Sequence, residues 1–234
     1  MSETQTPNQE LTHAAELMQQ KLGIDGMRQL NEQLEAWQEL NDRQQLHSPL
    51  REQLATGNTV LPEGTLMHGV RGVSLDTLRG IAEKGVISGE LLGVVEDTET
   101  HGCADFFKVP TDMTLGDYFI WAKEPQISGN SHTLRAERSY LSRMAVIIDP
   151  NAEGMAPLLE KDAYQDPSMT FASLPSSRDG ATTAAILGGI PRGAIAGLVF
   201  SEGFAAKAKL MNEVMLLFPD TPILTQTGET VSAQ

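Results

Sequence analysis

Residues 65–87 read TLMHGVRGVSLDTLRGIAEKGVI, and this stretch indicates the kind of fold. Its first part, from Thr65 to Val70, has the composition of a short strand. Ser74 is a favourable helix N-cap, and the apolar residues after it recur at helical spacing as far as Gly85. Glycine is the usual residue at a helix end, because it adopts left-handed backbone angles at little steric cost. The stretch therefore predicts a strand followed by a helix.

The rest of the chain after this unit predicts further short strands separated by irregular loops. The strands are expected at residues 105–109, 118–121, 144–148, 195–200, 214–218 and 223–227. Helices are expected over residues 132–144 and 204–212, and loops over 151–183. This arrangement favours an α+β domain with more than one sheet segment over a doubly wound parallel fold.

The chain before residue 59 has a different, helical pattern. From residue 8 to residue 57, apolar side chains recur every three or four positions, with Gln and Glu between them. Ser48-Pro49 interrupts the pattern, and a short helix is expected from Leu50 to Leu54. We therefore divide the chain into an N-terminal helical arm, residues 1–58, and an α+β domain, residues 59–234.

The composition excludes several classes of protein. Hydrophobic residues make up 40% of the 234, which is enough to fill a core. Lys and Arg number 17 against 31 Asp and Glu, and a net charge of −14 argues against nucleic acid as a partner. No apolar run is long enough for a membrane helix, and no secretory signal is visible at the N-terminus. With Cys103 as the single cysteine, these features predict a cytoplasmic protein.

Cys103 belongs to two constellations that could carry chemistry. His101, Cys103 and Asp105 alternate along a predicted strand and would share a face, as the ligands of a metal ion do. They lack the paired spacing of zinc motifs, so no metal site is assigned. Cys103 could instead be a nucleophile activated by His68 or His132, or simply a small buried hydrophobe.

Three segments, taken in order, resemble the His–Tyr–Glu signature of the poly- and mono-ADP-ribosyltransferases of the diphtheria-toxin type. They are His68-Gly69 with the helix and glycine that follow, Gly116-Asp117-Tyr118-Phe119, and Asn212-Glu213 before an apolar run. The resemblance covers residues 60 to 227. It implies an ADP-ribosyltransferase-like split mixed β-sheet core with flanking helices, preceded by the N-terminal helical arm.

The resemblance also implies an activity: NAD-dependent mono-ADP-ribosyl transfer with release of nicotinamide. Its catalytic residues would be Glu213, His68 and Tyr118. By the resemblance, His68 would hydrogen-bond the ribose and Tyr118 would stack on the nicotinamide ring. Glu213 would stabilise the positive charge that develops on the sugar as its bond to nicotinamide breaks.

Further contacts with NAD follow from the same resemblance. Gly69 would hold the carboxamide through its backbone, Arg71 would meet the pyrophosphate, and Tyr140 could stack in place of Tyr118. Val70 stands where many members of the family carry Thr or Ser. Because of this departure, a second interpretation remains: a catalytically silent binding module that works through its helical arm.

The acceptor of ADP-ribose is expected to be a protein or a small molecule, with a protein preferred. The related RNA 2′-phosphotransferase chemistry also uses NAD, but its substrate is phosphorylated RNA. The acidic balance of the chain argues against such a substrate.

Overall fold

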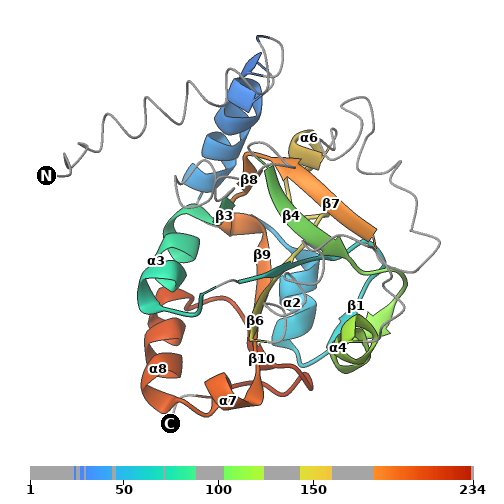
Figure 1. Cartoon of the computed structure of the whole chain (residues 1–234), viewed down its shortest axis with the longest axis vertical. Helices are drawn as coiled ribbons and strands as arrows, with labels where there is room; N and C mark the ends of the chain where they lie inside the picture. The colour runs from blue at the N-terminus through green and yellow to red at the C-terminus, as the bar shows by residue number, and fades with distance from the viewer. Residues whose placement is uncertain are drawn as a thin grey trace, which may run out of the picture.

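The computed structural model describes residues 30–43, 46–70, 72–87, 103–123, 143–159 and 182–232, together with Ile24, Met27 and Arg28. These residues form a mixed sheet with helices against it (Figure 1), so the α+β class predicted from the sequence is confirmed. No helix in the described part of the chain combines the length and the apolar character needed to cross a bilayer.

Within the described residues, the main sheet has six strands in the order β10-β9-β6-β2-β4-β7. They are β10 Ile223–Thr225, β9 Ile195–Phe200, β6 Met144–Ile148, β2 Leu66–Gly69, β4 Cys103–Lys108 and β7 Thr182–Leu187. β10 runs parallel to β9, and the other neighbours are antiparallel. The predicted strands at 105–109, 144–148, 195–200 and 223–227 are confirmed, whereas β7 was not predicted.

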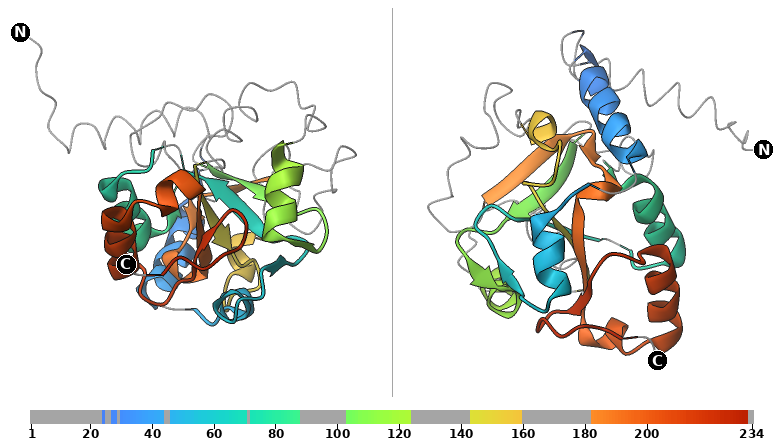
Figure 2. Two further views of the ribbon diagram at one scale, coloured as in Figure 1. Left: turned by 90° about the horizontal axis from the view of Figure 1, so that it is seen from below. Right: turned by 180° about the vertical axis from the view of Figure 1, so that it is seen from behind.

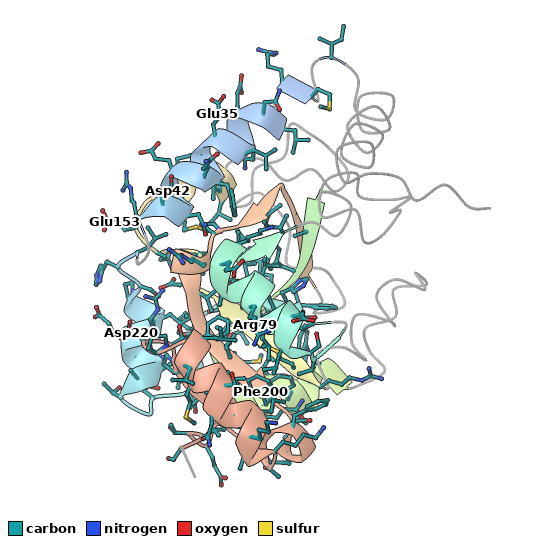
Figure 3. All side chains as sticks on the ribbon, turned by 90° about the vertical axis from the view of Figure 1, so that its left-hand side faces the viewer. Glu35, Asp42, Arg79, Glu153, Phe200 and Asp220 are labelled. Carbon is teal, nitrogen blue, oxygen red and sulfur yellow. The ribbon has the colours of Figure 1, made fainter. Side chains whose placement is uncertain are left out.

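The sheet is buried on both faces, which explains the continuous apolar runs of β6 and β9. One face packs against α3, Leu75–Lys84, and α8, Ala208–Leu217, and we call it the α3/α8 face. The other packs against α2, Pro49–Ala55, and α4, Leu115–Lys123, and we call it the α2/α4 face. Figure 2 shows these helices from two further directions, and Figure 3 looks towards α3 and α8.

Successive side chains of a strand point to opposite faces, and two clusters of buried residues follow this rule. The strand residues of the α3/α8 face include Leu66, Phe106, Val146, Leu198 and Phe200. Those of the α2/α4 face include Met67, Phe107, Ile147 and Val199. The described members of the two clusters therefore alternate along β2 and β6.

The helix after β2 forms as the sequence predicts. The Oγ of Ser74 accepts a hydrogen bond from the Thr77 amide at 3.1 Å, which caps the N-terminus of α3. Leu78 and Ile81 face the core, and Gly85 ends the helix at φ 76°. A Cβ on Gly85 would lie 2.2 Å from the Ile190 carbonyl oxygen, so the chain needs glycine here.

Short elements join the main parts of the fold. They are β1 Val60–Leu61 paired with β5 Met113–Thr114, β3 Val86–Ile87 paired with β8 Gly189–Ile190, α6 Ala156–Leu159, the 3-10 turn Arg192–Ala194 and α7 Glu202–Ala205. The β3–β8 pair lies directly after α3 and brings the chain back beside the turn that precedes β9.

The N-terminal part of the described chain is helical, as expected. A helix over residues 30–42 buries Leu30 and Leu40, and its outer side carries Glu35 and Asp42 (Figure 3). In α2, Ser48 is the N-cap, and Leu50 and Leu54 are buried in the cluster on the α2/α4 face. The last helix of the predicted arm therefore lies in the core beside β9.

Two predicted strands are helices. Residues 118–121 belong to α4, in which Tyr118 and Phe119 are buried while Ile120 is 64% exposed. Residues 214–217 belong to α8, in which Val214 is buried while Leu216 is 77% exposed. Short apolar runs fit a buried strand and the core side of a helix equally well, and pattern alone does not separate them. Of the helix expected over 132–144, all but the last two residues lie outside the described residues, and Met144 begins β6.

Candidate functional site

The candidate site lies where the main sheet divides. β2 pairs with β6 along its whole length, from Leu66 opposite Ile148 to Gly69 opposite Ala145. Within the described residues, β2 pairs with β4 only at Leu66 and Met67. β4 continues beside β7 down to Cys103. β2 and β4 therefore separate after Met67, and we call this point, formed by His68, Gly69 and Phe106, the fork.

His68 lies at the fork with its ring on the α3/α8 face. Met67 points to the opposite face, and the alternation of a strand places the His68 side chain beside Phe106 of β4. The two ring centroids are 5.5 Å apart, and the planes are tilted by 52°. His68 is half-buried, whereas Phe106 is 1% exposed. The imidazole thus has an aromatic neighbour and some access to solvent.

Gly69 ends β2 and is buried. The next residue, Val70, donates its amide to the Met144 carbonyl at 3.0 Å, so the chain still follows β6 as it leaves the sheet. It then reaches Ser74 and turns into α3. The strand, the fork and the capped helix form one continuous unit, which is the unit predicted from residues 65–87.

Tyr118 does not meet His68. It belongs to the cluster on the α2/α4 face, so the sheet lies between the two side chains. Its exposed fraction is 0%, and its ring contacts Phe119 and Trp121 at centroid distances of 5.5 Å and 5.6 Å. Burial raises the pKa of the Tyr118 phenol. A fully buried ring offers no face to a nicotinamide, so the stacking role expected for Tyr118 is wrong in this structure.

Glu213 lies on a helix that packs against the α3/α8 face. It is in the middle of α8 rather than at the start of a strand. The core-facing side of α8 is marked by Met211 and Val214. Glu213 lies about 200° around the helix axis from Met211 but only about 100° from Val214, and its side chain is half-buried. Asn212 and Leu216 of the same helix are exposed.

Several other candidate residues, or their side chains, lie outside the part of the chain that the structure describes. Arg71, Tyr140, His101 and His132 lie outside the described residues, and so do the side chains of Cys103 and Asp105. Among the described residues, no group of three or more His, Cys, Asp or Glu side chains gathers in a way that could hold a metal ion.

Two features of this region were missed by sequence reasoning. Phe106 was assigned to a strand, but its contact with His68 depends on which strands pair and in which register. The separation of β2 from β4 is likewise a property of pairing between distant segments. The Phe106-Phe107 pair was the available signal, because alternation places one ring of such a pair on each face.

A second polar centre lies at the opposite end of β6. Asp149 is 2% exposed, and its carboxylate accepts hydrogen bonds from Ser48 Oγ at 2.7 Å and the Leu50 amide at 3.0 Å. Arg51 donates to the Ile195 carbonyl at 3.0 Å and to that of Gly193. Burial lowers the pKa of Arg51, and the charge of Asp149 opposes that shift. These groups hold α2 against the sheet. Because their hydrogen-bond partners are within the protein, we assign the groups a structural role.

Comparison of the chain with models of protein families, with curated proteins and with solved structures finds no match. Function is therefore inferred from the residues of the fork and from the strand and helix that present them.

Proposed function

We propose that the protein binds NAD at the fork and transfers ADP-ribose to an acceptor, with release of nicotinamide. The observation that carries this proposal is the position of His68-Gly69 at the end of β2, where β2 leaves β4 but remains paired with β6. Glycine at this position has no side chain that would keep a flat amide-bearing ring from the backbone.

The chemistry of the reaction suits the residue types at the fork. Transfer breaks the bond between ribose C1′ and the nicotinamide nitrogen, and the acceptor nucleophile takes the ribose carbon. An imidazole has a donor and an acceptor nitrogen, and it can hold a ribose hydroxyl in place. Glycine allows a ligand to approach the backbone, which a side chain would prevent. In this proposal His68 orients the ribose and Gly69 holds the carboxamide.

Tyr118 and Glu213 have no part in the proposal. Tyr118 is on the far face of the sheet, and Glu213 is half-buried on α8, with no contact to His68 among the described interactions. We place the reaction in the cytoplasm, where NAD is at hand and where a single cysteine stays reduced. The preferred acceptor is a protein.

A second candidate function is supported by the same geometry. His68 and Tyr118, which the resemblance assigns to one site, lie on opposite faces of the sheet. A domain that keeps the strand and helix of an ADP-ribosyltransferase-like fold without its full catalytic set would bind a partner without cleaving NAD. The outer surface of the helix over residues 30–42 would then be the contact region of the helical arm.

The test is nicotinamide release from NAD by the purified full-length protein, measured beside three variants. We expect release by the wild type and a steep loss in His68→Ala. His47→Ala is the matched control, because its side chain is 62% exposed and pairs with Glu52 near the start of α2. Glu213→Gln should retain the wild-type rate, since the proposal gives this side chain no role.

The outcomes separate the two functions. Release that depends on His68 and not on His47 supports NAD cleavage at the fork. No release, together with no heat of NAD binding in calorimetry, rejects the proposed function and favours the binding module. Loss of release in Glu213→Gln would show that Glu213 takes part in the reaction and would contradict the proposal that His68 and Gly69 act without it.

A further inference from the structure

We infer that Phe106 is a positioning residue for His68: its ring fixes the orientation of the imidazole at the fork. The inference rests on the proposed function, because it concerns the residue that would hold the ribose. It goes beyond that function by assigning a role to a residue that no sequence pattern singled out.

Phe106 is well placed for this role because its own position is fixed. β4 pairs with β7 continuously from Lys108 to Cys103, so the backbone at Phe106 is held on that side. Its side chain is 1% exposed and belongs to the cluster on the α3/α8 face, with Leu66 and Val146. A ring packed in this way has few alternative rotamers.

His68 stands in a different situation. Its backbone is paired with Val146 of β6, but the ladder between β2 and β4 ends at Met67 in the described residues. The ring contact with Phe106 therefore links the two strands across the fork after their hydrogen-bonded pairing has ended. The centroid distance of 5.5 Å and the 52° tilt lie in the range that aromatic pairs prefer.

The contact restricts the torsion that matters for binding. The χ2 angle of histidine has a broad energy profile, so an imidazole without a neighbour samples many orientations. A packed ring at one side excludes most of these orientations of the imidazole. It thereby fixes the directions in which the two ring nitrogens point. Orientation of this kind is valuable, because a reacting group misplaced by about 1 Å can cost on the order of 100-fold in rate.

The test compares Phe106→Leu with Phe107→Leu. The two phenylalanines are neighbours on β4 with similar burial, 1% and 3% exposed, but Phe107 packs on the α2/α4 face. Both variants remove the same atoms from a buried position, so both should lower the melting temperature. Only Phe106→Leu should change the environment of His68.

Three quantities are measured for each variant: the melting temperature, the NMR shifts of the His68 ring protons, and kcat and KM for nicotinamide release. The His68 signals are assigned by their loss in His68→Ala. In Phe106→Leu we expect these protons to move as the ring current of Phe106 is removed, and kcat/KM to fall on the order of 100-fold. In Phe107→Leu we expect both to stay near their wild-type values.

Equal His68 shifts and equal kinetics in the two variants would overturn the inference and leave the proposed function standing. If the wild type neither binds nor cleaves NAD, the proposed function fails. Nuclear Overhauser contacts from the His68 ring protons to residues other than Phe106 then decide the positioning role, because they change only if the imidazole turns. Phe106→Met retains more of the side-chain volume and replaces the leucine variant if that variant does not fold. A wild-type His68 spectrum in a folded Phe106→Met protein likewise overturns the inference.

Discussion

At the scale of single residues, Asp149 illustrates what a buried charge requires in this fold. Its Oδ2 accepts hydrogen bonds from the Ser48 hydroxyl and the Leu50 amide, and its Oδ1 accepts one from the Asn151 amide at 2.9 Å. Each donor belongs either to the start of α2 or to the turn after β6. A single carboxylate thus accepts hydrogen bonds both from the N-terminus of α2 and from the turn that follows β6.

Asp149→Ala should lower the free energy of unfolding by about 3 kcal/mol, because it leaves buried donors without an acceptor. Urea denaturation measures the change. Asp76→Ala is the control, since its side chain is 94% exposed and pairs only with Arg79 among the interactions described; an exposed pair contributes about 0–1 kcal/mol. Equal effects of the two substitutions would reject the structural role of Asp149.

Tyr118 presents the opposite case, a buried polar atom without a partner among the described residues. Removing that hydroxyl in Tyr118→Phe should raise the free energy of unfolding by about 1 kcal/mol, because an unsatisfied hydroxyl is costly to bury. It should leave nicotinamide release unchanged. A clear loss of stability would show that the hydroxyl has a hydrogen-bond partner, and a loss of release would show that it has a role in the reaction. Either result would contradict this placement.

The pH dependence of the same residue has a definite sign. Burial raises the pKa of Tyr118 in the folded protein above its value in the unfolded chain. The stability associated with the un-ionised phenol is therefore fully present below the unfolded-state pKa of about 10. Stability falls as the pH rises above that value, because the phenol ionises first in the unfolded state. Between about pH 9 and 11 the wild type should lose more stability than Tyr118→Phe. Parallel curves for the two proteins would contradict burial of the phenol.

At the scale of elements, the predictable parts are those with local signals. α3 was predicted because its cap, its apolar spacing and Gly85 all lie within one short segment. Residues 118–121 of α4 and the end of α8 carry apolar runs that predict strands, because runs this short reveal no helical period. The helix predicted over 204–212 covers the first half of α8. β7 was missed because an antiparallel edge strand depends on its neighbour β4 for its pairing. The fork, and with it the contact of His68 and Phe106, depends on the same long-range pairing.

The glycine at the start of β8 gives an element-scale prediction. Gly189 has φ 124°, and a Cβ there would lie 2.1 Å from the Val86 carbonyl oxygen. Gly189→Ala should therefore cost at least about 2 kcal/mol of stability, since both strain and a backbone clash result. Gly80→Ala is the control within α3. Its Cβ would meet nothing within 4 Å, and it should raise stability by about 1 kcal/mol through helix propensity.

At the scale of the whole molecule, the sheet separates two environments. The α2/α4 face is filled by α2 and α4 and encloses Tyr118, so the described part of that side is core. The α3/α8 face carries the fork, the half-buried His68 and the helix that follows it. Two residues that follow a family signature in the sequence, His68 and Tyr118, therefore lie on opposite faces of the sheet, and a third, Glu213, lies on a helix. Order along the chain does not by itself establish a site, because the register of the sheet decides which side chains meet.

The most direct test of the central claim is an amide NMR titration of the protein with NAD. Binding at the fork predicts that the signals of His68, Gly69 and the start of α3 move together and saturate, while those of α4 around Tyr118 stay in place. Saturable shifts centred on α4, or no shift at Gly69 at NAD concentrations that saturate any other signal, would contradict the account.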